Sequence, residues 1–444
     1  MKRSPVRLGW VLGLALGSMS AATLAAPPAS PTRARSSAKK PPVAEHAPYL
    51  VTGVELHVGD GSVLENATIV VRDGRFEAVG GPELAAKYDA GYARIDLAGK
   101  IVTPGFIAAH TSLTLEEIGA ERSTVDSHVE RESYIRAGYD PAAAVNAESS
   151  LLRVQAVEGV TTAAVTPFGG LLSGGAVWVD LVQVDFGGLV VARRIAIAGR
   201  LGQSVEGNRA ASLQRLREVL EDADFYAKNA RSFDRGQSRP LAADPADLEA
   251  LGPVLDGERP LVLAMNRASD ILGAIELAEE FGIELVIVGG AEGWKVAKQI
   301  ADAKATVVVM PSTNLPSSFD QLGARLDNAA LLHAAGVSIV IAQLGEPHNV
   351  RNMKQEAGIA IANGLDREAA VVATTLNVAR AYGMDAEYGS VATTKVANFV
   401  VWEHDPFELD SFPERVFIRG VDTPLVSRQS LLRDRYMERL DLGR

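Results

Sequence analysis

The chain has 444 residues, and it contains no cysteine and only seven histidines. Without cysteine there can be no disulfide framework, no cysteine-ligated zinc, no iron–sulfur cluster and no thiol nucleophile. Any metal site must therefore be built from histidine and carboxylate ligands, and seven histidines are a small supply.

Long apolar runs are also lacking. The run from Leu8 to Met19 is too short for a transmembrane helix, which needs about 20 residues.

What is present is the composition of a globular protein with a large core. Apolar residues make up 47% of the chain and charged residues 22%, which excludes a disordered or fibrous class. At roughly 150 residues per domain, the length allows two or three domains, or one large barrel with an appendage.

The N-terminus has the order of a secretory signal. Met1–Arg7 carries three basic residues, the apolar run follows, and small residues lead to Ala25 and Ala26. We predict a signal peptide over residues 1–25, with an uncleaved anchor as the alternative. Residues 26–48 are rich in Pro, Ser and basic side chains and predict a flexible linker. The mature protein is therefore expected to be exported, periplasmic or extracellular, with no membrane association once the signal is removed.

The charge balance bears on partners. Residues 1–47 hold seven of the 44 basic residues and one of the 55 acidic ones. The remainder has 37 basic and 54 acidic residues, a formal net charge of −17. A surface of that sign repels phosphate backbones, so nucleic acid is not expected as a partner.

The second half of the chain alternates apolar strands with amphipathic helices, which favours a parallel sheet covered by helices, either doubly wound or closed into an eight-stranded barrel. The expected strands are 261–264, 284–288, 306–310 and 337–341, and the expected helices 269–281, 294–303, 326–335 and 367–382.

Both ends of the mature chain have sequence patterns typical of β-strands. Near the N-terminal end, Asp60-Gly61 and Asp73-Gly74 indicate hairpin turns, and near the C-terminal end, residues 396–402 and 416–420 are rich in strand-forming residues. We therefore predict an α/β fold in which a (β/α)8 TIM-type barrel at 104–384 is inserted into a small β-sandwich domain. That composite domain would be formed by residues 49–103 plus 385–430.

One sequence motif is similar to that of a known family with this architecture. Residues 99–110, with Pro104-Gly105-Phe106-Ile107 and His110, resemble the amidohydrolase superfamily, specifically its imidazolonepropionase-like members. Residues 50–80, 158–162 and 389–406 also resemble that family, in the same order along the chain. The resemblance implies the barrel fold and a hydrolase of non-peptide C–N bonds. It also implies one or two zinc-type divalent metals that activate water at the carboxyl ends of the strands.

The family's ligand pattern is only partly present. His110 matches the first histidine of the H-x-H pair, but Ser112 stands at the second. In the motif expected at strand five, Ala264 and Asn266 stand where the family has histidines. In the motif expected at strand six, Gly289 stands where the family has a histidine. After the last strand, residues 341–344 contain no aspartate, and Asn398 replaces the aspartate of the closing phrase. Metal affinity grows with ligand count, so one imidazole predicts weak metal binding.

The candidate site residues follow from these phrases. His110 is a remnant metal ligand, a general base acting without metal, or a hydrogen-bonded histidine facing solvent at a strand end. Arg267, Glu292, Glu346 and His348 are candidate substrate-binding residues, because they lie in phrases expected to follow barrel strands. His128 is expected in a solvated loop.

Two glycine-rich segments allow further hypotheses. Backbone N–H groups in Gly289–Lys295 are a candidate anion site or an ordinary turn between a strand and a helix. Residues 168–175 read as a flexible loop and a candidate lid.

Two functions stay open. The first is an exported amidohydrolase-type hydrolase whose catalysis is weak or lost because most metal ligands are missing. The second is a non-catalytic barrel that binds a small molecule, or that pairs with itself or with an intact related amidohydrolase. The substrate and the oligomeric state do not follow from the sequence.

Overall fold

The computed structural model describes residues 47–88, 91–128, 134–182, 188–202 and 207–440. The predicted signal peptide and all but the last two residues of the predicted linker lie outside these ranges. Within them, no helix has the length and apolar character needed to cross a membrane.

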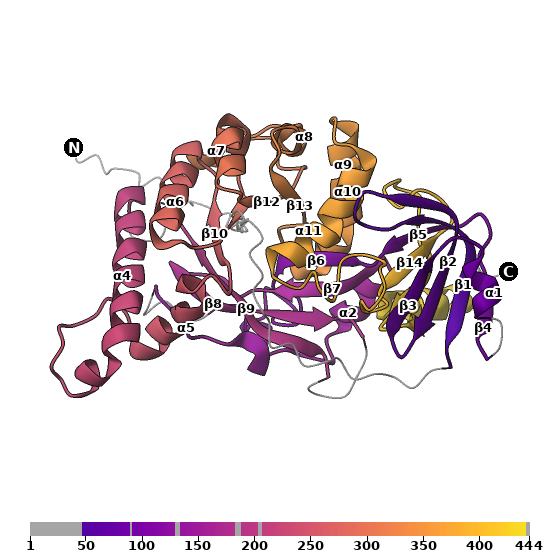
Figure 1. Ribbon diagram of the computed structural model, residues 1–444, viewed down its shortest axis with the longest axis horizontal. Coiled ribbons are helices and arrows are strands. Elements are labelled where there is room, and N and C mark those ends of the chain that lie inside the picture. The colour runs from indigo at the N-terminus through magenta and orange to yellow at the C-terminus, as the bar shows by residue number, and fades with distance from the viewer. Residues whose placement is uncertain (1–46, 89–90, 129–133, 183–187, 203–206, 441–444) are drawn as a thin grey trace, which may run out of the picture.

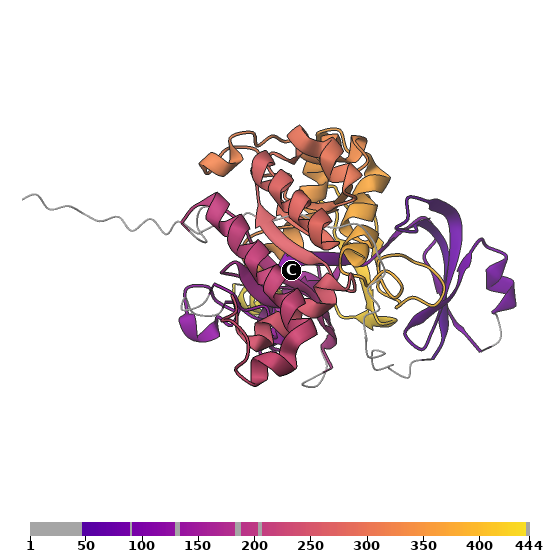
Figure 2. The same cartoon turned by 60° about the vertical axis from the view of Figure 1, so that its left-hand side comes forward.

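The first sheet joins the two ends of the described chain (Figures 1 and 2). β5 pairs antiparallel with β14, Pro104 opposite Phe399, so segments almost 300 residues apart share one sheet. Its core includes Phe399 and Phe417, whose rings stack at 4.3 Å. The order is β16-β15-β14-β5-β1-β2-β3, with β4 also paired to β1; the strands are β1 Tyr49–His57, β2 Val63–Arg72, β3 Arg75–Gly80, β4 Ala93–Asp96, β5 Ile101–Pro104, β14 Phe399–Trp402, β15 Pro413–Ile418 and β16 Val421–Thr423.

These pairings agree with the expectation that both ends contribute to one β-rich part. They form a single hydrogen-bonded sheet of eight strands, and the sandwich arrangement and the domain boundaries stay predictions.

The second sheet also has eight strands and forms a nearly closed barrel, in the order β13-β12-β11-β10-β9-β8-β7-β6. The helices α10 and α11 contact both edge strands, β6 and β13, so they cover the place where the barrel closes. The strands are β6 Phe106–Thr111, β7 Val160–Val165, β8 Leu172–Asp180, β9 Val190–Arg200, β10 Leu261–Met265, β11 Leu285–Gly289, β12 Thr306–Val309 and β13 Ser338–Ile341.

The barrel departs from the predicted all-parallel (β/α)8 pattern at β8. This strand is antiparallel to both β7 and β9, and all nine of its residues are buried. The prediction of a flexible lid over 168–175 is therefore wrong from Leu172 onward. Gly174 and Gly175 lie inside this strand, and both positions favour glycine because a Cβ atom there would come within 2.8 Å of Tyr139 or Arg194.

Helices follow the strands of the second half as predicted and cover the barrel (Figure 1). Thr375, with φ −134° and ψ −89°, divides the predicted helix over 367–382 into two. The helices are α1 Leu84–Lys87, α2 Ser150–Ala156, α4 Arg209–Asp234, α5 Pro245–Leu255, α6 Ala268–Phe281, α7 Ala297–Asp302, α8 Asn328–Ala334, α9 Met353–Ala362, α10 Arg367–Thr374, α11 Leu376–Ala381 and α12 Arg428–Arg439. Short 3-10 turns occur at η1 Arg122–Thr124, η2 Pro141–Ala143, η3 Gly293–Val296, η4 Phe319–Gln321 and η5 Pro347–Asn352.

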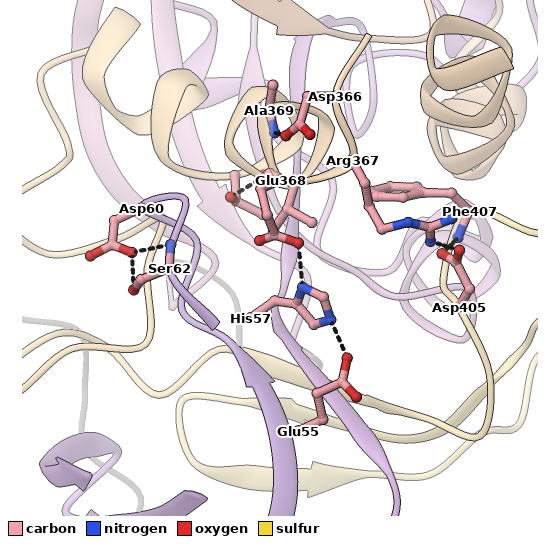
Figure 3. A network of polar contacts seen from close by, with 12 residues as sticks. Glu55, His57, Asp60, Ser62, Asp366, Arg367, Glu368, Ala369, Asp405 and Phe407 are labelled. Atoms are coloured by element: carbon pink, nitrogen blue, oxygen red, sulfur yellow. Dashed lines mark hydrogen bonds and ion pairs between the residues drawn. The ribbon is translucent and has the colours of Figure 1, made fainter. Parts of the chain in front are cut away.

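A histidine between two carboxylates links the first sheet to a barrel helix (Figure 3). His57 on β1 places Nδ1 2.7 Å from Glu368 on α10 and Nε2 3.1 Å from Glu55. Beside it, Arg367 on α10 forms an ion pair with Asp405 of the segment after β14.

A buried carboxylate makes a second junction. Asp180, at the end of β8, lies 2.7 Å from Nε of Arg419, and their side chains are 0% and 5% exposed. The Tyr388 hydroxyl donates to the same carboxylate at 3.0 Å, and Asn398 Nδ2 and the Thr162 hydroxyl donate to its other oxygen at 3.1 Å. The amide at Asn398 suits this position, because an aspartate there would put a second negative charge against Asp180.

We predict that Asp180→Asn lowers the free energy of unfolding by about 3 kcal/mol or more, because it leaves the buried Arg419 without its counter-charge. Urea denaturation followed by circular dichroism measures this. Asp302→Asn is the control, since it removes an ion pair whose side chains are 82% and 64% exposed, and its effect should stay within about 0.5 kcal/mol. Equal losses in the two variants would contradict the assignment.

Candidate active site

The carboxyl ends of seven barrel strands, β6, β7 and β9–β13, gather at one end of the barrel. β8 runs the other way, so its carboxyl end, with Asp180, lies at the opposite end. Barrels of this type carry their sites on the loops after the carboxyl ends of strands. We call this end of the molecule the barrel mouth.

His110 lies on a β-bulge at the mouth. The pairing of β6 with β7 shifts register between Ala108 and Thr111, and His110 has φ +51°. A left-handed backbone at a residue other than glycine is strained, and such strain is concentrated at functional sites. The sequence thus located the residue, although the bulge could not be predicted from it.

The imidazole of His110 is buried, so the expectation that it faces solvent is wrong. The residue is 5% exposed, and its ring packs edge-on against Phe168 with centroids 5.1 Å apart. Its Nδ1 atom is buried without a hydrogen-bond partner among the described residues. Burial lowers the pKa of His110 to about 4, so the ring is neutral at physiological pH.

The other positions matched to the family's metal ligands do not fit a metal. Ala264 and Gly289 have no donor side chain, and both lie at the mouth on neighbouring strands, in register with Arg200 and Met265 respectively. Gln343, after β13, offers only a neutral amide. Within the described ranges, no group of three His, Asp or Glu side chains is placed to hold a metal ion. We therefore derive no chemical step through a metal.

Asn266 joins the loops that follow β10 and β11. Its Oδ1 accepts from the Ala291 N–H at 3.2 Å, and its main-chain oxygen accepts from the Glu292 N–H at 3.0 Å. Asn328 continues the network, since its Oδ1 accepts from Trp294 N and its Nδ2 donates to Gly290 O. The backbone N–H groups of residues 290–294 thus have partners within the protein, and their predicted use as an anion site is not supported by this geometry.

Glu292 is 8% exposed and connects three loops. One carboxylate oxygen lies 2.6 Å from Lys295 Nζ and accepts from Gly323 N, and the other accepts from Ala268 N. Although its burial raises the pKa, these contacts outweigh it and lower the pKa of Glu292 overall. Its oxygens are committed to loop contacts, so the structure places this predicted substrate-binding residue in the scaffold of the mouth.

Arg267 lies at the start of α6, half-buried, and its charge acts on Asp270 one turn along the helix. Burial nevertheless raises the pKa of Asp270. Arg267 stays a candidate for substrate binding, on the loop next to Asn266.

Glu346 and His348 lie at the start of η5, exposed, on the loop after β13. His128, also exposed, lies on the loop after β6, and its backbone bridges to Phe168, whose ring packs against His110. The structure thus brings the candidate residues to one end of the barrel on different loops.

Sequence reasoning missed Asn328 and Arg325, which line a pocket at the mouth with Asn266 and Gly289. An asparagine next to a helix start and an arginine in a loop give no distinctive pattern. Spatial proximity to Asn266 is the signal that identifies them.

Comparison with known proteins places this geometry in context. A sequence profile of the Amidohydrolase family matches residues 256–424. The curated protein amidohydrolase tasK from Hapsidospora irregularis is 26% identical over 374 residues, which covers 71% of this chain and 36% of that protein. The chain therefore spans about a third of that relative's length.

Solved structures show the same fold. An amidohydrolase from Thermotoga maritima superimposes with a TM-score of 0.74 at 24% identity, covering 86% of this chain and 100% of its own. An adenosine deaminase from Xanthomonas campestris, solved with bound zinc, has a TM-score of 0.53 at 15% identity and covers 89% and 98%.

We predict that the buried neutral His110 makes stability fall in acid. As pH drops from about 6.5 towards 4, the unfolded chain binds a proton at this ring before the folded chain does, which lowers the free energy of unfolding by roughly 3 kcal/mol. His110→Asn, whose side chain tolerates the left-handed backbone, should remove this part of the pH dependence. Denaturant unfolding at pH 7 and pH 4.5 measures it.

The matched control is His348→Asn, which removes an exposed imidazole at the same mouth. It should retain the pH dependence of the unaltered chain. If His110→Asn also retained it, the buried and neutral state of His110 would be refuted.

Proposed function

The chain belongs to the amidohydrolase superfamily, and from that premise we propose that its barrel binds a small molecule with a non-peptide C–N bond, while metal-dependent hydrolysis is weak or lost. This proposal rests on the side chains at the mouth that could serve as metal ligands. His110 alone supplies an imidazole at a family ligand position, and Ala264 and Gly289 supply no donor at all.

The chemical reason lies in what a metal must do in such a site. A bound divalent ion lowers the pKa of water only while several protein ligands hold it in an open, fixed geometry. One neutral imidazole gives little affinity, because affinity depends on ligand number and on the partners that orient each ligand. The absence of most of the family's ligands therefore acts on metal retention first and on turnover as a consequence.

A second candidate function is a non-catalytic barrel that binds a small ligand, alone or as a partner subunit of itself or of an intact relative. The network through Asn266, Glu292 and Asn328 favours it. These side chains tie together the loops after β10, β11 and β12 without a metal, so the mouth retains a defined shape for binding.

We also propose that the protein is exported, as the N-terminal charge and apolar pattern support. An exported protein with a net charge of −17 outside that segment has a small molecule, rather than nucleic acid, as its expected partner.

We predict that the purified mature protein, dialysed against chelator and then against zinc-free buffer, holds well below one metal per chain, about 0.1 or less. Elemental analysis by mass spectrometry measures this directly. Retention of about one zinc, nickel, manganese or iron per chain would contradict the weakened metal site.

The two candidate functions differ in turnover. Lactams, cyclic ureas and nucleobases form a suitable substrate panel, because each carries a non-peptide C–N bond. Hydrolysis that His110→Asn abolishes, with the fold unchanged by circular dichroism, would favour a residual hydrolase. Binding without turnover in both proteins would favour the non-catalytic barrel.

A further inference from the structure

Three large apolar side chains lie exposed on the loop between β12 and α8. Leu315, Phe319 and Leu322 are 73%, 83% and 62% exposed. Phe319 and Leu322 are three residues apart across the 3-10 turn η4, so their side chains project from the same side of that turn. We call these three residues the loop patch. Single exposed apolar residues are ordinary on a protein surface, whereas three on one short loop are typical of a contact surface.

Hydrogen bonds hold this loop in a defined shape. Gln321 is fully buried, and its Oε1 accepts from the N–H of Ser317 at 3.3 Å and from the hydroxyl of the same residue. The indole N–H of Trp294 donates to Gly323 O at 2.8 Å, which ties the end of the turn to η3. A fixed turn therefore presents the loop patch to solvent, so that binding a partner costs this loop little conformational entropy.

The size of the loop patch suits the centre of a protein interface. A large apolar residue has roughly 150–200 Å² of surface, so the three exposed fractions add to about 400 Å². A standard interface buries about 800 Å² on each partner, of which about 55–65% is apolar. The loop patch thus supplies most of the apolar area that one partner contributes to such an interface.

The charges beside the loop patch come in pairs of opposite sign. Asp320 pairs with Arg209, Asp327 pairs with Arg325, and all four side chains are partly exposed. This border is therefore neutral, whereas the chain after residue 47 has 54 acidic and 37 basic residues. Two copies of so acidic a chain repel each other, and a neutral border keeps that repulsion small where their loop patches meet.

We propose that the loop patch is the centre of a two-fold interface between two copies of this chain. An isologous interface must be complementary to itself. An apolar centre meets this requirement, and the border has both signs, so each copy offers aspartates to the arginines of the other. A strongly acidic or basic partner would instead select a border of one sign. The interface requires neither a metal nor turnover, so this inference goes beyond the proposed function.

Sedimentation velocity of the full mature chain tests the proposal, together with the variants Leu315→Ser and Phe319→Ser. The unaltered chain should form a dimer with a Kd of about 10 µM or tighter. A two-fold interface contains each residue twice, so either substitution should weaken the dimer at least about 30-fold. Both side chains are exposed, so circular dichroism should show an unchanged fold.

Leu409→Ser is the matched control. Leu409 is 73% exposed, as Leu315 is, but it lies on the segment between β14 and β15. This variant should keep the Kd within about twofold of the value for the unaltered chain. Salt gives a second readout. Raising NaCl from about 50 mM to about 500 mM should tighten the dimer, because it screens the repulsion between two acidic chains.

The proposal is overturned if the unaltered chain stays monomeric up to about 100 µM, or if Leu315→Ser and Phe319→Ser dimerise as the unaltered chain does. It is also overturned if Leu409→Ser dissociates the dimer equally, if salt weakens the dimer, or if larger species form, because a two-fold contact closes on itself. Metal content and turnover are not part of these readouts, so failure here is distinct from failure of the proposed function.

Discussion

The carboxylate of Asp180 is the contact through which the two halves of the molecule depend on each other. It is fully buried, pairs with Arg419 and accepts from Tyr388, Asn398 and Thr162. A buried charge is tolerated only when its hydrogen bonds are complete, so the C-terminal segment must be in place for the barrel to be stable. Because β8 is antiparallel to its neighbours, this anchor lies at the barrel end opposite the mouth. The Asp180 contact that stabilises the fold therefore lies at one end of the barrel, and the candidate site lies at the other.

That separation allows the mouth to vary while the fold is retained. Loops that a metal would hold together are joined here by side-chain contacts, with Asn266 and Glu292 accepting backbone N–H groups from neighbouring loops. His110 differs from these residues, because its ring is buried, its backbone has a left-handed φ and its Nδ1 has no partner among the described residues. The strain is paired with an unused hydrogen-bonding atom, the combination expected of a residue that acts on a ligand rather than on the scaffold.

Much of the fold could be predicted from the sequence because its signals are local. The strands and helices from Leu261 to Ile341 follow from alternating apolar and amphipathic runs, and the structure confirms them within a few residues. β8 was missed because glycines at 174 and 175 resemble a loop, and only the contacts of Tyr139 and Arg194 show that glycine is favoured at these strand positions. Asn398 seemed a lost acidic residue, since its partner Asp180 is 218 positions away. The position of His110 could be predicted from its motif, whereas its burial and the bulge depend on Phe168 and β7.

The central claim is that the barrel mouth is held by hydrogen bonds and not by a metal. Differential scanning calorimetry of the mature protein, with excess zinc and with chelator, tests it most directly. A metal present at 100 times its dissociation constant would add about 2.7 kcal/mol to the stability of the folded state. The account predicts unfolding temperatures that agree within about 1 °C in the two buffers, which for a chain of this length corresponds to slightly under ~1 kcal/mol and lies well below the roughly 3 °C that such a metal would add. A rise of several degrees with zinc, reversed by chelator, would contradict it.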